Sequence, residues 1–252
     1  MSVRMRLYSP LARPVIKDVG ASTISRGSQG EAPVPARPPN FGGDSVDIDL
    51  RWESIFSQGK TICYRSGQPM LLKGSPKGNV LRVVEGWALA TDPHPDGTPT
   101  FLELRGRGQL LGETSALSGE LRNADVTAVC RTVVQAIGHE RFLAGLGCND
   151  VLVGMLLHAQ QLHKTANVRA GLRRFGVASG LSRLLLDLAR TAGAPLVAGI
   201  PQKVLADVLG VTPRTLYGAV AELGRRGAIS TRWPVVHITD EVVLKELARS
   251  DA

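Results

Sequence analysis

Residues Pro201–Ile229 read PQKVLADVLGVTPRTLYGAVAELGRRGAI, and this stretch predicts two short helices joined by a tight turn. Its first half repeats apolar residues at the three-to-four-residue spacing of an amphipathic helix. They are Val204, Leu205, Val208 and Leu209. Gly210 favours the left-handed backbone that ends a helix, while Thr212 and Pro213 suit the N-cap and the first position of the next helix. Two helices that cross at such a turn form a helix-turn-helix, whose second helix enters the DNA major groove.

The outward face of the second helix carries polar and basic side chains. Leu216, Val220 and Leu223 share the inward face, as helical spacing requires. An ordinary helical hairpin inside a core is the competing interpretation, but the hydrogen-bond donors on the outward face favour contacts with phosphates and bases. The residues expected to contact DNA are Thr212, Arg214, Thr215, Tyr217, Gly218, Arg225 and Arg226.

Charge and composition agree with a polyanionic partner. The 252 residues carry 30 Lys and Arg against 22 Asp and Glu, for a net charge of +8. From Lys164 onward there are 13 basic and 7 acidic side chains, so the excess gathers around the helix pair. The sequence shows no secretory signal and no apolar run near the ~20 residues of a spanning helix. We therefore expect a cytoplasmic protein without membrane association.

Residues 1–45 are rich in Pro, Gly, Ser and Arg and predict a disordered tail. Beyond them, short apolar runs alternate with glycines and turn signals, which is typical of an antiparallel sandwich or barrel. This pattern predicts a β domain at 46–147. A C-terminal domain at 174–252 would hold a further helix, the helix pair, a strand–turn–strand wing and a closing helix. The fold class expected is α+β.

A long helix is predicted between these domains, at 148–173. Apolar and small residues repeat along it at four-and-three spacing, which is the seam of a two-helix coiled coil. The predicted seam residues are Leu152, Leu156, Ala159, His163 and Ala166. A helix packed against its own domain is the alternative, and the seam favours a homodimer.

The sharpest chemistry of the β domain lies at Gly112-Glu113 and Arg122. Glycine lets the backbone approach a ligand, a carboxylate accepts from sugar hydroxyls, and a guanidinium grips a phosphate with a planar fork. The amides of Glu113, Thr114 and Asn123 would add donors, so the set could hold a sugar phosphate. A surface Glu–Arg ion pair without function is the competing interpretation of this spacing.

The segment LLGETSALSGELRNADVTA resembles the phosphate-binding cassette of cyclic-nucleotide-binding domains. With the long helix and the helix-turn-helix, residues 46–240 resemble a Crp/Fnr-type transcriptional regulator. The resemblance implies that Glu113 contacts a ribose hydroxyl and Arg122 the cyclic phosphate. Asn123 stands where the family carries Ser or Thr, and Thr114 stands where an apolar residue is usual. In the second helix Pro213-Arg214 and Gly218 replace the family's base-reading residues, which implies a different operator.

We accordingly predict a homodimeric regulator that binds an inverted-repeat DNA operator and is controlled by cAMP or cGMP, with no covalently bound cofactor. RNA polymerase is a candidate partner. A β domain that only serves as a scaffold or partner-binding surface is one alternative, and a jelly-roll metalloenzyme is another. No catalytic set or metal-ligand spacing is present, and Cys63, Cys130 and Cys148 are scattered. The effector, the operator, the sign of regulation and the role of the tail do not follow from the sequence.

Overall fold

The structure is a computed structural model that describes residues 52–94, 96, 99–146, 156 and 176–249. The predicted tail at 1–45 lies outside the described residues. So does the predicted helix at 148–173, apart from Leu156. The domain boundaries that depend on these segments stay predictions.

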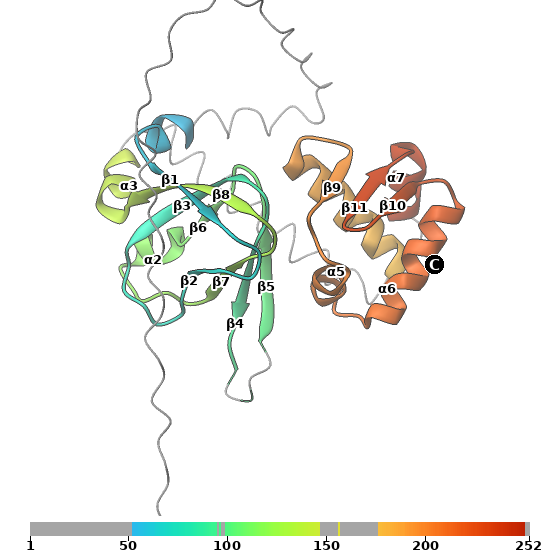
Figure 1. Ribbon diagram of the computed structural model, residues 1–252, viewed down its shortest axis with the longest axis horizontal. Coiled ribbons are helices and arrows are strands. Elements are labelled where there is room, and N and C mark those ends of the chain that lie inside the picture. Colours follow the sequence, from blue (N-terminus) through green and yellow to red (C-terminus); the bar gives the residue numbers. More distant parts are fainter. Residues whose placement is uncertain (1–51, 95, 97–98, 147–155, 157–175, 250–252) are drawn as a thin grey trace, which may run out of the picture. The chain divides into compact units, whose positions relative to one another are not determined.

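Strands in the first part of the described chain form a jelly-roll-like β domain of two facing antiparallel sheets (Figure 1). One sheet has the described order β1-β8-β3-β6 and the other β2-β7-β4-β5. The strands are β1 (Lys60–Tyr64), β2 (Pro69–Leu71), β3 (Asn79–Glu85), β4 (Ala88–Asp92), β5 (Thr100–Arg105), β6 (Leu110–Leu111), β7 (Asp125–Ala128) and β8 (Thr132–Gly138). Within the described residues the sheets form a two-layer roll rather than a closed barrel.

Alternate residues of these strands fill the space between the sheets. Leu81 and Val83 on β3 stand beside Ala136 and Val134 on β8, and all four are buried. Residues two apart on a strand point to the same face, so the two ladders supply one continuous apolar layer. Burying a side chain such as Leu81 stabilises the fold by about 1.5–3 kcal/mol.

A second apolar cluster holds the helices of this domain in place. Residues 52–56 are helical, and Trp52 lies against Phe142 of α3 (His139–Gly145) with ring centroids 6.4 Å apart. Ala116, from the short helix α2 (Glu113–Ser118), belongs to the same cluster. The cluster therefore anchors α2, the helix at the centre of the predicted ligand site.

The C-terminal part is a winged helix-turn-helix domain (Figure 1). Residues 176–192 are helical, and the elements that follow are β9 (Leu196–Ala198), α5 (Gln202–Leu209), α6 (Pro213–Arg225), β10 (Ile229–Arg232), β11 (Val235–Ile238) and α7 (Glu241–Arg249). In the described chain the wing sheet has the order β10-β11-β9. Strand β9 was not predicted, because three residues beside Pro195 give too short a pattern to detect.

The predicted turn between the two helices has the expected geometry. Gly210 ends α5 with a φ of +64°, and the Thr212 hydroxyl caps α6 by accepting from the Thr215 amide at 3.2 Å. Leu216 and Leu223 are buried on the inward face of α6. The predicted α+β class, with a jelly-roll domain and a winged helix-turn-helix domain, is confirmed.

Candidate functional site

Two glycines frame the predicted ligand-binding segment. Gly112 follows β6 directly and has a φ of +78°, and Gly119 ends α2 with the same φ. This left-handed backbone strains any residue with a Cβ, so glycine lets the strand turn abruptly into a one-and-a-half-turn helix. The turn places Glu113 at the start of α2, and the chain after Gly119 brings Arg122 back to the same place.

Arg122 is the most enclosed cation of this segment, with only 5% of the residue exposed. Its Nη1 donates to the Gly112 carbonyl at 2.6 Å and to the Ser115 hydroxyl at 2.7 Å, and its Nη2 donates to the Asn79 carbonyl at 2.6 Å. Burial lowers the pKa of Arg122, while the Glu113 carboxylate acts to raise it. The guanidinium is thus fixed in one position at the start of α2.

The side chain of Arg122 depends on the missing Cβ of Gly112. A Cβ built at Gly112 would lie 2.0 Å from Nη1 of Arg122, far inside van der Waals contact. At Gly119 the nearest atom would be Nζ of Lys77, 3.9 Å away. Gly112 is therefore required both by its backbone conformation and by the close approach of the guanidinium.

Glu113 belongs to a buried ionic cluster that the sequence did not reveal. Its Oε1 lies 3.2 Å from Nη2 of Arg105, and Oε2 of Glu103 lies 2.7 Å from the same nitrogen. The side chains of Arg105 and Glu113 are only 8% and 7% exposed. Nη1 of Arg105 also donates to the Leu110 carbonyl at 3.1 Å. Desolvation by burial raises the pKa of Glu103, which the charge of Arg105 only partly offsets.

The remaining predicted ligand residues lie at the surface. The structure brings Gly112, Glu113 and Arg122 together, whereas Thr114 and Asn123 are exposed. Ser115 was missed, although its buried hydroxyl bonds Arg122. Its position could have revealed it, because Ser115 lies two residues after Glu113, on the face of α2 that is directed toward Gly112.

The predicted DNA-contacting residues lie on one exposed side of α6 and around its ends. Arg214, Thr215, Tyr217 and Gly218 are all exposed, with Tyr217 at 67%. The hydroxyls of Thr212 and Thr215 lie 2.8 Å apart, so these two residues form the helix cap. Exposed donors near a helix N-terminus, where the amides point outward, can approach the phosphates of a groove.

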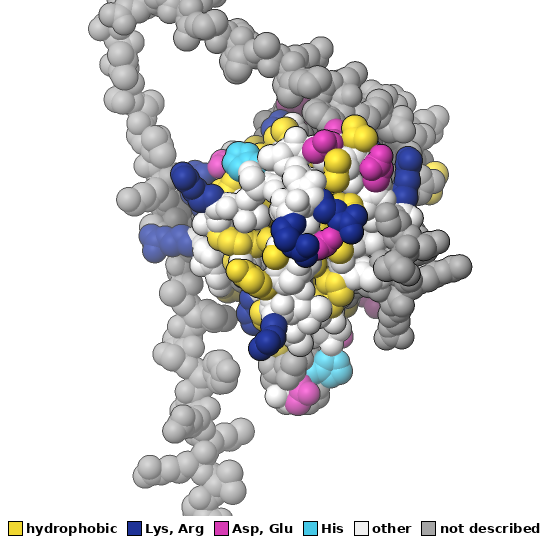
Figure 2. Space-filling view, turned by 90° about the vertical axis from the view of Figure 1, so that its right-hand side faces the viewer, with side chains coloured by type: hydrophobic (Ala, Val, Ile, Leu, Met, Phe, Trp, Pro, Cys, Tyr) yellow, Lys and Arg dark blue, Asp and Glu magenta, His cyan; other side chains and the backbone are white. Residues whose placement is uncertain are grey.

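The other end of α6 carries an ion-pair cluster. Glu222 accepts from Nε of Arg226 at 2.6 Å and also pairs with Arg225. The hydrogen bond from Arg226, with the charges of both arginines, holds the pKa of Glu222 below its usual value. Basic side chains gather near the centre of the face shown in Figure 2, with acidic side chains beside them. Arg232, at the end of β10, adds an exposed cation on the wing that the sequence prediction did not include.

Most of the predicted dimer seam lies outside the described residues, namely Leu152, Ala159, His163 and Ala166. Leu156 is helical and 63% exposed. The described residues contain no group of three or more His, Cys, Asp or Glu arranged to hold a metal. Among the helices that the structure describes, none is long and apolar enough to cross a membrane.

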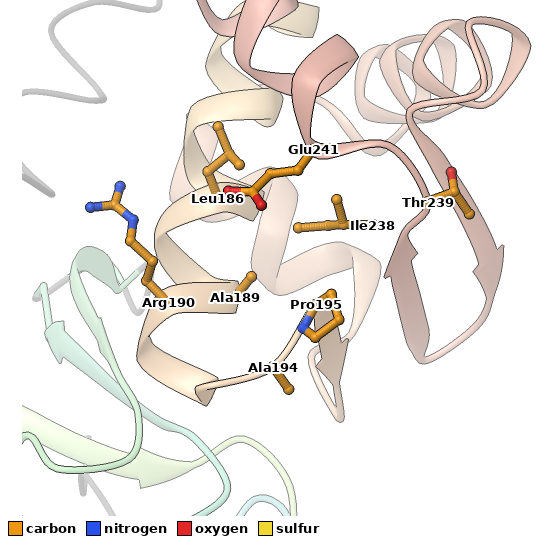
Figure 3. A pocket seen from close by; sticks show the side chains of 8 residues that line it. All are labelled: Leu186, Ala189, Arg190, Ala194, Pro195, Ile238, Thr239 and Glu241. Atoms are coloured by element: carbon orange, nitrogen blue, oxygen red, sulfur yellow. The ribbon is translucent and has the colours of Figure 1, made fainter. Parts of the chain in front are cut away.

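A pocket of about 220 Å³ lies within the C-terminal domain, and no residue of α6 belongs to its lining (Figure 3). Its wall is mainly apolar, and Arg190 points away from it in Figure 3. The lining residues are Leu186, Ala189, Arg190, Ala194, Pro195, Ile238, Thr239 and Glu241. None of the predicted site residues belongs to this lining.

Both parts of the chain match known families. Residues 61–147 match the family model of the cyclic nucleotide-binding domain, and residues 181–247 match that of the Crp-like helix-turn-helix domain. The first match contains the segment around Gly112 and Arg122, and the second contains α5, α6 and the wing.

Similar proteins match over most of the chain. The chain is 28% identical over 212 residues to the cyclic AMP receptor protein of Thermus thermophilus, covering 81% of this chain and 93% of the relative. It is 22% identical over 204 residues to a CRP-like cAMP-activated global transcriptional regulator of Mycobacterium tuberculosis, covering 78% and 91%. The structure of FixK2 from Bradyrhizobium japonicum shares the fold, with a TM-score of 0.65 and 19% identity over 77% of this chain and 99% of that one.

Proposed function

This chain belongs to the Crp/Fnr family of transcriptional regulators, and we propose that it acts as a homodimer whose β domain binds a cyclic nucleotide. The relatives from Thermus and Mycobacterium are named for cyclic AMP, which makes cAMP the first ligand to test and cGMP the second. The regulator would read an inverted repeat through α6 of each subunit.

The buried position of Arg122 is the observation that carries the nucleotide proposal. A guanidinium has five N–H donors, and the hydrogen bonds of Arg122 to described residues use three of them. The remaining donors suit a phosphate oxygen, and the desolvated surroundings strengthen such a charge-assisted bond. Glu113, the first residue of α2, offers a carboxylate to a sugar hydroxyl.

The charge balance of the site favours a cyclic phosphate over a terminal one. Arg105 and Arg122 oppose Glu103 and Glu113, so the four buried or nearly buried side chains are formally neutral together. A cyclic phosphodiester brings one negative charge, while a phosphate monoester brings closer to two at neutral pH. A second uncompensated charge in a desolvated site is costly, so the monoanion is the better match.

Calorimetric titration of the purified protein with cAMP and cGMP tests the proposal. Arg122→Ala should weaken the better ligand roughly ten- to a hundredfold, because it removes a charge-assisted hydrogen bond worth about 1.5–3 kcal/mol. Arg131→Ala is the matched control, since Arg131 is exposed and pairs with Glu85. A wild type that binds neither nucleotide would leave the β domain as a scaffold or partner-binding surface.

The DNA part of the proposal rests on the exposed face of α6. Arg214 lies in the first turn of the helix, opposite the buried Leu216, so it would point into the major groove. An arginine there can donate to O6 and N7 of guanine. Arg225, Arg226 and Arg232 would contact the backbone, which positions the domain without selecting sequence.

The dimer part rests on the four-and-three repeat along 148–173 and on the exposure of Leu156. A leucine that is 63% exposed on a helix in the single chain is suited to packing against a second copy. Replacing Leu156 and Ala159 with Glu would place like charges across the two-fold axis. The double variant should sediment as a monomer, and a wild-type sedimentation coefficient would place the interface elsewhere.

A further inference from the structure

We propose that Arg105 is a positioning residue of the ligand site, which holds the Glu113 carboxylate for a ribose 2′-hydroxyl and is itself held by Glu103. This inference rests on the proposed binding of a cyclic nucleotide. It adds that selectivity for a ribose over a 2′-deoxyribose depends on a side chain that does not itself contact the ligand.

The geometry places Arg105 directly behind Glu113. Its Nη2 lies between the two carboxylates, 3.2 Å from Oε1 of Glu113 and 2.7 Å from Oε2 of Glu103. Its Nη1 donates to the carbonyl of Leu110, the residue that begins β6. The guanidinium of Arg105 therefore bonds both the backbone before Gly112 and the first residue of α2. These two contacts hold both ends of the turn in place.

The sheet is built to accommodate this charged pair inside the roll. Glu103 and Arg105 are two residues apart on β5, so they share one face of the strand. Their cross-strand partners on β4 are Ala90 and Ala88, and Ala88 is fully buried in the apolar core. Two small partners leave room for two long side chains, and the ionic pair occupies space that larger apolar residues could fill.

The charges explain why Glu103 is needed. If Glu113 were the only carboxylate beside Arg105, the guanidinium would donate to it more strongly. It would then compete with a ligand hydroxyl for the Glu113 oxygens. Glu103 lies closer to Nη2 than Glu113 does, so it takes the larger share of this donor. The longer bond from Arg105 orients the Glu113 carboxylate, to which the ligand hydroxyl would donate as a further partner.

The test compares cAMP and cGMP with their 2′-deoxy counterparts by calorimetry on the full-length protein. The wild type should prefer the ribose form of its better nucleotide roughly ten- to a hundredfold, the value of one charge-assisted hydrogen bond. Arg105→Lys keeps the charge but not the fork, and should reduce this preference to about threefold or less. The loss should fall on the ribose ligand, with affinity for the 2′-deoxy ligand changed less than about twofold.

Two further variants make the result decisive. Arg131→Lys, a matched change in an exposed ion pair, should leave the preference unchanged. Glu103→Gln removes the second charged acceptor and should lower the preference about threefold or more, which tests the idea even if Arg105→Lys does not fold. Equal weakening of both ligands, or an unchanged preference in Arg105→Lys and Glu103→Gln, would overturn the positioning role and leave nucleotide binding standing. A wild type that binds no nucleotide would overturn both.

Discussion

The charged residues around Gly112 and those on α6 are arranged in opposite ways. Arg105, Glu113 and Arg122 are each less than a tenth exposed, and every one has partners fixed by the fold. On α6, Arg214 and Arg225 are exposed. Arg214 lies between the two threonines that form the helix cap, and Arg225 shares the Glu222 carboxylate with Arg226.

The difference indicates what each region can recognise. A buried cluster of charged side chains at fixed distances suits one small ligand of matching charge and shape, because moving any one of these side chains leaves the charge of another uncompensated. Exposed long side chains can follow the varying positions of phosphates and base edges along a groove. Substitutions should therefore affect folding and ligand binding together at the first region, and DNA binding alone at the second.

The largest expected effect is on stability, at Arg105. Arg105→Met leaves the carboxylates of Glu103 and Glu113 buried without their shared cation, and should lower the free energy of unfolding by about 3–5 kcal/mol. The same change at exposed Arg225 should fall within experimental error. Chemical denaturation of both variants measures the contrast. Equal losses would show that burial does not separate the two regions.

The next effect concerns the close approach at Gly112. Gly112→Ala should weaken cyclic nucleotide binding roughly ten- to a hundredfold, since its Cβ would displace Arg122 from the ligand. Gly119→Ala is a matched control with the same φ of +78° and open space around the new methyl group. It should lose stability of about 1–2 kcal/mol from backbone strain and retain affinity. Comparable affinity in the two variants would contradict the role given to the guanidinium.

At α6 the expected effect is one of sequence preference. Arg214→Ala should remove about 1–3 kcal/mol of discrimination at one base pair in each half-site, whereas Arg225→Ala should weaken all sequences alike. Parallel selections from random DNA with the wild type and both variants provide the measurement. An unchanged half-site motif in Arg214→Ala would mean that another residue reads that base pair.

The smallest effect is the pH dependence of the β domain. Burial raises the pKa of Glu103 above its ordinary value of 4.5, so the folded state binds this proton more tightly than the unfolded state. Its contribution to stability is therefore greatest below 4.5 and declines as the pH rises through the raised pKa. Glu103→Gln should flatten that decline. Thermal unfolding across this range is the measurement, and an unaltered slope would indicate that Glu103 titrates as it does in the unfolded chain.

The helix-turn-helix was the part most open to prediction from sequence. The spacing of Leu216, Val220 and Leu223 specifies an inward face, and local rules at Gly210 and Thr212 set the two helix ends. These signals act over three or four residues, so they can be recognised without knowledge of the rest of the fold. Strand order and strand β9 could not be obtained this way, because ladders join residues far apart in the chain.

The ligand site was predictable in part. Gly112, Glu113 and Arg122 were found through a family pattern, and the structure brings them together. Arg105 and Glu103 were missed because alternation on a strand does not say that a charged pair points inward. Only the pairing of β5 with the alanines of β4 places them in the roll, beside a helix eight residues further on.

The carboxylate of Glu222 has a consequence for the thermodynamics of DNA association. Arg225 and Arg226 already share this anion, three and four residues away on the same helix. When an arginine exchanges this carboxylate for a phosphate, Glu222 loses part of its neutralisation and can recruit a cation from solution, so fewer cations are released net for each phosphate contacted. Association through this end of α6 should thus depend less steeply on ionic strength than the number of arginines suggests.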